Sequence, residues 1–286
     1  MNPTLEKREK TLERLRPKAK MYVATIDTVP EYKICWHYDQ PRNLRKLIPL
    51  VKENNKVTIG NYCTHYRGFF RQRNSAEFMI DIGANIGLSA FPVASLGHKV
   101  VCFEPTPINI EILKHAIQIN NFSDLVRVEE VAISNNNGSM TIFVPEGRAD
   151  NASLNLVCSD LNLRDNTPVP TSITAVTFDH WWNNHSKDLM MENARLFKVD
   201  TQGHELSVLN GATEFLSEAT QYENIILEIE WDHGFLTTQG IDGEEILNKI
   251  HQLGYEVYMP RELAPRDFKE FTAQNNHCDL LCRTRS

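Results

Sequence analysis

The chain has 286 residues, a formal net charge of −7 and 41% hydrophobic residues, which is typical of a soluble globular protein with one large domain or two small ones. The acidic balance argues against general nucleic-acid binding, and no run approaches the roughly 18 apolar residues of a membrane span. The six cysteines form no CxxC pair and the N-terminus lacks an apolar signal segment, so we expect buried thiols and a cytoplasmic location.

The first predicted element is a charged helix over residues 3–16, which Pro17 ends. Residues 18–75 mix aromatic and basic side chains without a clear period. We therefore predict a small, helical N-terminal cap over residues 1–75 on a main domain of residues 76–286. The charged helix could be partly docked on that domain or could bind a partner. A nucleic-acid patch within 18–75 is a weaker alternative, because the basic signal is short and the chain is acidic.

From residue 76 onward, short apolar runs alternate with segments of helical periodicity. Strands are predicted at 77–81, 99–104, 125–133, 172–178, 194–200 and 223–230, helices at 88–97, 107–121, 204–211 and 242–254, a turn with a short strand at 135–145, and a closing antiparallel pair at 255–259 and 278–282. Alternating strands and helices predict an α/β domain whose parallel sheet carries helices on both faces.

Two local signals refine the helix boundaries. Pro92 lies inside the first helix of the alternation and removes an interior hydrogen bond, a loss of about 3 kcal/mol in a free helix, so this helix should kink or begin near Ser89. Asp242 and Glu245 have the spacing of a capping box, and Gly254 follows the end of the same helix.

The stretch 146–171 is too long and too polar for a simple connection. It could form a lid or an acceptor-specificity loop, and disorder is an equal alternative. Because it lies outside the glycine turn, changes in it should affect acceptor use more than cofactor affinity. Trp181 and Trp182 are interpreted as packing residues of the core or rim, with a substrate platform as the weaker alternative.

The strand 77–81 ends in Asp81 and leads into a glycine turn, Gly83-x-Asn85-x-Gly87, ahead of a helix. In an open parallel sheet, ligands bind beyond the carboxyl ends of the strands. A dinucleotide motif needs a second glycine where this chain has Asn85 and a third where it has Leu88. A phosphate-binding P-loop is also excluded, because no Gly-Lys-Ser/Thr follows.

S-adenosylmethionine (SAM) carries no phosphate and fits this turn better. Gly83 would let the backbone pass close to its amino-acid end, Asn85 can offer an amide to its carboxylate, and Gly87 lets the helix start pack tightly. Glu104, which ends the next strand, is placed to accept hydrogen bonds from both ribose hydroxyls. A carboxylate at that position would suit NAD equally, so the preference for SAM depends on the turn.

Six segments occur in the order "DIGANIGLSA", "VVCFEPTPINIEIL", "VEEVAIS", "TFDHW", "LFKVDTQGHELSVLNGA" and "ILEIEW". In this order they resemble the FkbM-type SAM-dependent methyltransferases over roughly residues 76–260. The resemblance implies a doubly wound, mostly parallel, seven-stranded, Rossmann-like sheet and methyl transfer, usually to a hydroxyl of a sugar or natural product. By position it also places Ala132 near the adenine. Together with Asp81 at the end of its strand, the predicted cofactor-binding residues are Gly83, Asn85, Gly87, Glu104 and Ala132.

Asp200 and His204 are the predicted catalytic residues. Asp200 ends the fourth strand, next to the expected methyl position, and His204 stands at the start of a helix, which disfavours a protonated imidazole. A hydroxyl acceptor must lose its proton, which requires a base or a metal. A solvated or capping role for His204 remains an alternative. Glu228, Glu230 and Asp232 could join Asp200 around a divalent cation, but we predict no metal.

The combined prediction is a SAM-dependent O-methyltransferase that acts on a small or glycosidic hydroxyl. An N-methyltransferase is the main alternative, and a nicotinamide oxidoreductase is more distant because of Asn85. The non-enzymatic alternative is a SAM-binding scaffold protein. The identity of the acceptor and the oligomeric state do not follow from these patterns.

Overall fold

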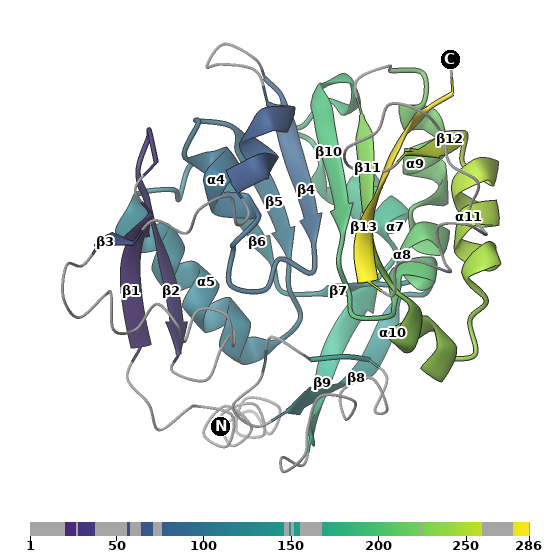
Figure 1. Cartoon of the computed structure of the whole chain (residues 1–286), viewed down its shortest axis with the longest axis horizontal. Coiled ribbons are helices and arrows are strands. Elements are labelled where there is room, and N and C mark those ends of the chain that lie inside the picture. Colours follow the sequence, from purple (N-terminus) through teal and green to yellow (C-terminus); the bar gives the residue numbers. More distant parts are fainter. Residues whose placement is uncertain are drawn as a thin grey trace.

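The computed structural model describes residues 21–26, 28–37, 56–57, 64–70, 76–145, 149, 152–154, 168–222, 225–258 and 277–285. A seven-stranded sheet of order β12-β13-β11-β10-β4-β5-β6 forms the centre of the molecule (Figure 1). Its strands are β4 (Phe78–Ile82), β5 (Lys99–Phe103), β6 (Val126–Glu129), β10 (Ala194–Val199), β11 (Ile226–Asp232), β12 (Tyr255–Tyr258) and β13 (His277–Thr284). The strands from β6 to β11 pair in parallel, and β13 pairs antiparallel with β11 and β12. The predicted sheet and its closing antiparallel pair are therefore confirmed.

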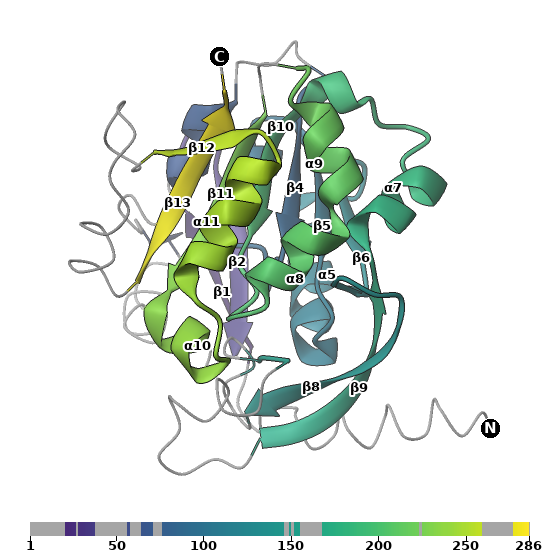
Figure 2. The ribbon, with the colours of Figure 1, turned by 90° about the vertical axis from the view of Figure 1, so that its right-hand side faces the viewer.

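Helices cover both faces of this sheet, as a doubly wound fold requires (Figure 2). One face packs on α4 (Ala90–Ala94) and α5 (Pro107–Asn120), and the other packs on α7 (Phe178–His185), α8 (Glu205–Gly211), α9 (Thr213–Ala219) and α11 (Gly243–Gln252), with α10 (His233–Thr238) beside them. All five residues of β4 are buried, because apolar side chains meet a helical layer on each side. Trp181 is 2% exposed and packs edge-on against Phe103, so it belongs to the core.

The local helix signals are confirmed. Helix α4 begins at Ala90, directly after Ser89, which places Pro92 in the first turn, where a backbone N–H has no intrahelical partner. Helix α11 has the predicted capping box between Asp242 and Glu245.

The predicted strand 125–133 is wrong as a single element. It divides into β6 and the two-residue β7 (Ala132–Ile133), which leaves the central sheet. β7 instead joins a three-stranded sheet of order β7-β9-β8 with β8 (Gly138–Pro145) and β9 (Pro168–Val176). Strand β9 thus includes the end of the polar stretch 146–171. Exposed and buried side chains alternate along β9, because one face of this small sheet is open to water, and its sequence therefore reads as polar.

The described part of residues 1–75 is mainly β-structure. It contains β1 (Met21–Ile26), β2 (Tyr32–His37), β3 (Lys56–Val57) and the 3-10 helix η1 (Thr64–Phe69). β1 and β2 pair antiparallel, and the main chain of Lys33 exchanges hydrogen bonds with the Asn120 amide at the end of α5. The helical character of the cap is not confirmed, and the predicted helix 3–16 lies outside the described residues. The domain boundary between residues 75 and 76 stays a prediction.

The described residues also bear on the predictions for the cysteines and for membrane spans. The cysteines Cys35, Cys102, Cys278 and Cys282 are free thiols. Within the same part of the chain, no helix is long and apolar enough to cross a membrane.

Candidate functional site

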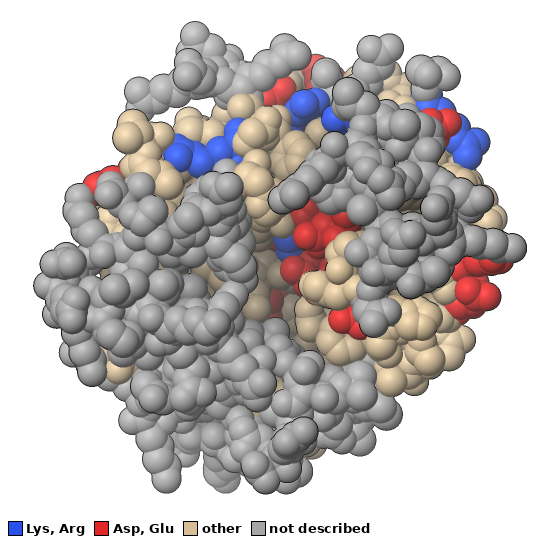
Figure 3. All heavy atoms as spheres, viewed as in Figure 1, with Lys and Arg blue, Asp and Glu red and all other residues tan. Residues whose placement is uncertain are grey.

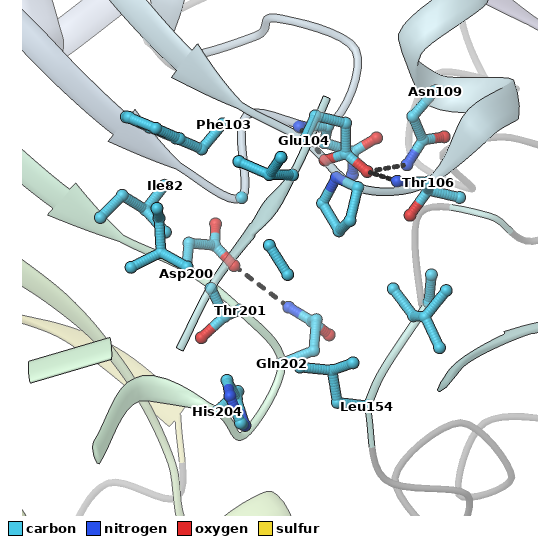
Figure 4. Close-up of a pocket in the computed structure, with 18 of the residues that line it drawn as sticks. Ile82, Phe103, Glu104, Thr106, Asn109, Leu154, Asp200, Thr201, Gln202 and His204 are labelled. Carbon is cyan, nitrogen blue, oxygen red and sulfur yellow. Dashed lines mark hydrogen bonds between the residues drawn. The ribbon is translucent and has the colours of Figure 1, made fainter. Parts of the chain in front are cut away.

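A cavity of about 690 Å³, part of it open to solvent, lies at the carboxyl ends of β4, β5 and β10 (Figure 4). Its walls come from the turn after β4, the residues after β5, the small sheet, and the loop between β10 and α8. Ala149, Ala152 and Leu154 from the stretch 146–171 also line it. The position is the one expected for a ligand in an open parallel sheet.

The turn after β4 brings the backbone close to the neighbouring strand. Gly83 has a φ of +83°, and a Cβ atom there would lie 1.8 Å from the main-chain oxygen of Asp200. Only glycine fits this close approach. Asn85 also has a positive φ, of 53°, and its buried Oδ1 has no hydrogen-bond partner among the described residues. Both residues line the cavity, as predicted.

Two of the predicted cofactor-binding residues do not line the cavity. A Cβ at Gly87 would lie 2.5 Å from the Phe91 ring, so this glycine permits tight packing of the turn on α4, as the sequence indicated. Asp81 is fully buried beneath the turn, where its Oδ2 accepts a 2.6 Å hydrogen bond from Ser89 Oγ and its Oδ1 lies 3.6 Å from Lys198 Nζ. Gly87 and Asp81 therefore stabilise the turn through packing and hydrogen bonding without lining the cavity.

Glu104 is held at the cavity wall by main-chain groups. Its Oε2 accepts a hydrogen bond from the Asn85 N–H at 2.8 Å, and its Oε1 accepts one from the Thr106 N–H at 2.8 Å and a longer one from Asn109 Nδ2 at 3.4 Å. Burial raises the pKa of Glu104, while these hydrogen bonds lower it. The carboxylate is thus fixed in place, and it can accept further hydrogen bonds from a ligand. Figure 4 shows it on the same side of the cavity as Asn109.

The opposite wall holds charged groups at the ends of β10 and β11. The strand register places Lys198 beside Asp81 on one side and beside Glu228 on the other. Lys198 Nζ lies 2.9 Å from Asp200 Oδ2. Burial lowers the pKa of Lys198, but the surrounding carboxylates raise it well above its ordinary value. Conversely, burial would raise the pKa of Asp200, but Lys198 and hydrogen bonds from its neighbours hold it below its ordinary value.

Gln202 also lines the cavity, and its side chain connects Asp200 with Glu230, which does not line it. The Gln202 amide Nε2 lies 3.2 Å from Asp200 Oδ1 and 3.1 and 3.0 Å from the two oxygens of Glu230. Burial, followed by the charges of Asp200 and Glu205, raises the pKa of Glu230 well above its ordinary value. The surroundings therefore favour the ionised form of Asp200 and the protonated form of Glu230.

His204 lines the cavity and is largely buried. Its Nε2 lies 3.0 Å from Ser134 Oγ, and burial lowers its pKa to about 4. The neutral imidazole stays a prediction, and the structure favours it through burial rather than through the helix end. At the N-cap of α8 its side chain makes no capping hydrogen bond. Among the described contacts, none joins His204 to Asp200, so the two predicted bases lie on one wall without forming a hydrogen-bonded dyad.

Further carboxylates lie beyond Asp200 on the same face of the sheet. Figure 3 shows acidic side chains gathered beside a basic one in a hollow of this face. Tyr66 Oη donates a 2.7 Å hydrogen bond to Glu228, whose pKa burial raises to about 7. Asp232 caps α10 and lies 3.3 Å from His277. In the described part of the chain, no three His, Cys, Asp or Glu side chains are arranged to hold a metal ion.

Sequence reasoning missed Lys198 and Gln202. The available signal for Lys198 was a lone charge inside the apolar run "ARLFKVD", two residues before Asp200. The signal for Gln202 was its position before Gly203, in a turn where it adopts a φ of +55°. Their contacts with Asp81, Glu228 and Glu230 depend on strand register and could not be read from the chain.

The fold and the site define a Rossmann-like α/β protein with a pocket at the carboxyl ends of β4, β5 and β10, where the strand order reverses between β4 and β10. Residues 81–257 match the model of the methyltransferase FkbM domain, and the chain belongs to this family of methyltransferases.

Individual relatives are more distant. Methyltransferase sdnD of Sordaria araneosa is 24% identical over 233 residues, which cover 70% of this chain and 82% of that protein. A crystal structure of methyltransferase FkbM from Methylobacillus flagellatus KT matches at 22% identity and a TM-score of 0.43, with 76% of this chain covered; this chain spans about half, 47%, of that one. A structure of M. jannaschii TYW2 in complex with AdoMet matches at 12% identity and a TM-score of 0.40, with 94% and 87% of the two chains covered.

Proposed function

We propose that this protein transfers a methyl group from SAM to a hydroxyl of a sugar or other small natural product. The observation that carries the proposal is the Glu104 carboxylate, fixed at the cavity wall by two main-chain amides and facing a glycine turn that lacks the phosphate-binding pattern. Membership of the methyltransferase family supports the class of reaction.

The residues around the cavity fit SAM. Gly83 and Asn85 line the cavity where the amino-acid end would lie, and the Asn85 amide could donate to its carboxylate. Glu104 would accept hydrogen bonds from the ribose hydroxyls, and Ala132 would lie against the adenine with the apolar side chain of Ile142. A vicinal diol matches the two oxygens of a fixed carboxylate, which is why Glu104 is the strongest single indication of a ribose.

The chain itself has to align the acceptor and take up a proton. Bound SAM supplies a methyl group on a positively charged sulfur, which is already activated toward an incoming oxygen. Alignment then accounts for much of the rate. Asp200, ionised by Lys198, and neutral His204 are the two groups on the cavity wall able to accept the hydroxyl proton. As the acceptor oxygen gains the methyl group, its proton would pass to one of these side chains and then to water.

A thermal-shift series with SAM, its demethylated product and NADH tests the cofactor. Ligand at 100 times its dissociation constant should stabilise the fold by about 2.7 kcal/mol. We expect SAM and S-adenosylhomocysteine (SAH) to raise the midpoint and NADH to leave it unchanged. A rise with NADH alone would contradict the proposal and favour an oxidoreductase.

Incubation with methyl-labelled SAM and fractionated small metabolites tests the acceptor. Label should appear in a hydroxyl-bearing compound as a methyl ether. Label on an amine nitrogen would identify an N-methyltransferase instead. SAM binding without transfer to any fraction would support the non-catalytic alternative.

A further inference from the structure

Gln202 lines the cavity and has no role in the reaction described above. Its φ of +55° is unusual for a residue with a side chain. The adjoining loop holds it there: the Glu205 Oε1 atom accepts hydrogen bonds from the N–H groups of Thr201 and Gly203, each at 3.0 Å. The strained conformation is therefore maintained by a buried carboxylate on the first turn of α8.

All the described hydrogen bonds of the Gln202 side chain are to carboxyl oxygens. Its amide nitrogen lies within 3.2 Å of one oxygen of Asp200 and both oxygens of Glu230. An amide nitrogen can only donate, so it favours negative charge on these carboxyl groups. Figure 4 shows the Gln202 side chain pointing toward Asp200.

The main chain of Gln202 makes a second connection, to the wall on the other side of the cavity. Its carbonyl oxygen accepts a 3.1 Å hydrogen bond from Ser153 Oγ. Ser153 is 2% exposed, its backbone pairs with that of Phe143, and its neighbours Ala152 and Leu154 line the cavity. One residue thus connects the segment that would cover the cofactor with the carboxyl groups that would face the acceptor.

We propose that Gln202 is a positioning residue for methyl transfer: its side chain holds Asp200 and Glu230 as one proton-sharing pair, and its main chain fastens that pair to the cofactor-covering segment. The inference builds on the proposed function, because it assumes that the cavity holds the methyl donor. Residues 152–154 would then contribute to cofactor affinity as well as to acceptor use.

Several other charges act on this carboxyl pair and must stay constant in any test. The charged and titratable groups that face it from the surrounding elements are Lys198, Asp81, Glu205, Glu228, Asp279 and His277. Substitutions at Gln202 and Ser153 leave all of them in place. Gln202→Met preserves the length of the side chain and removes the donor, and Gln202→Glu preserves its shape and adds a charge. Neither substitution changes the backbone strain, because both residues carry an unbranched Cβ.

The test of the side chain is a carboxyl titration in protein without ligand. Aspartate and glutamate are labelled with ¹³C at the side-chain carboxyl, and Asp200→Asn and Glu230→Gln assign the two signals. In the wild type, we expect the pair to titrate in two coupled steps, with Asp200 ionised first. Gln202→Met should raise the apparent pKa of the first step by about one unit, and Gln202→Glu by at least as much. Titration curves that coincide with the wild type in both variants, folded by circular dichroism, would overturn the side-chain role.

The test of the main-chain connection is calorimetry with SAH. Ser153→Ala removes the hydrogen bond to the Gln202 carbonyl and keeps the backbone pairing with Phe143, so SAH affinity should fall by about 2- to 10-fold. The ligand-free titration of the carboxyl pair should stay as in the wild type. Unchanged SAH affinity would overturn the connection. If SAH fails to bind the wild type, the proposed function fails, while the titration still decides the side-chain role.

Discussion

The two walls of the cavity are built in different ways. At the ends of β4 and β5, Glu104 is held by main-chain amides and the turn is shaped by a glycine. At the ends of β10 and β11, side chains shift one another's pKa: Lys198 lowers the pKa of Asp200, while burial and the charge of Asp200 raise the pKa of Glu230. The first wall is suited to holding an unchanging part of a ligand, and the second to taking up a proton.

This difference predicts that substitutions on the two walls have separable effects. Changes at Glu104 should alter affinity for the cofactor, since they touch groups that do not take part in the reaction. Changes at Asp200 should alter turnover and pH dependence. Variants that affect both quantities equally would show that the two walls act as one unit.

The largest effect is expected for Asp200→Asn, which keeps the shape of the side chain and removes the base. Turnover of labelled SAM with the acceptor fraction should fall by about 10² to 10⁴, with SAH affinity unchanged. Asp188→Asn is a matched control, because Asp188 is exposed and its charge pairs only with surface residues among those described. Activity should survive EDTA; loss restored by magnesium would favour the cation alternative, and full activity of the variant would remove Asp200 from the reaction.

The next effect concerns the close approach of the two walls. Gly83→Ala should destabilise the protein by about 2–4 kcal/mol, because a Cβ would collide with the Asp200 carbonyl at 1.8 Å and the positive φ adds strain. Gly97→Ala separates these two causes, since Gly97 has a φ of +91° with nothing within 4 Å of its added Cβ. We expect about 1 kcal/mol there. Chemical denaturation measures the free energy of unfolding of both variants. Equal losses would mean that the Asp200 main chain moves away from the added Cβ at little cost.

On the cofactor wall, Glu104→Ala should weaken SAH binding by about 10- to 100-fold, since a hydrogen bond to a charged group contributes about 1.5–3 kcal/mol. The control on the other wall is Glu228→Gln, which retains the size of a buried side chain beside Tyr66. Its SAH affinity should match the wild type. Calorimetry that finds Glu104→Ala folded and unchanged would refute the ribose contact.

The smallest effect is a pH dependence of stability from His204. Its pKa is lowered from 6.5 to about 4 in the folded protein, so the unfolded chain binds a proton more readily between these values. The stabilisation is complete above about pH 6.5 and is lost as the pH falls toward 4. The difference in unfolding free energy between wild type and His204→Gln should change by about 1–2 kcal/mol across this window, allowing for partial exposure of the ring. If the difference in unfolding free energy does not change with pH, the His204 imidazole stays solvated in the folded protein.

The features that depend on neighbouring residues were predicted well. The glycine turn, the position of Glu104 after its strand, the start of α4 at Ala90 and the capping box at Asp242 all lie within a few residues of their signals. The failures are contacts between distant segments. β7 leaves the run 125–133 to pair with β9, and the described N-terminal residues form strands against α5 instead of a helical cap.

The sequence by itself determined the class of fold, the position of the cavity after β4 and β5 and the polar side chains that end those strands, because periodicity, turn residues and the residue that ends each strand are local properties. Only the tertiary structure decided which of these groups act together. The register that sets Lys198 opposite Glu228 also brings Asp200 next to Glu230, across 30 residues of chain. Since a shift of one residue would turn these side chains to the other face of the sheet, the carboxyl pair exists only through the packing that fixes that register.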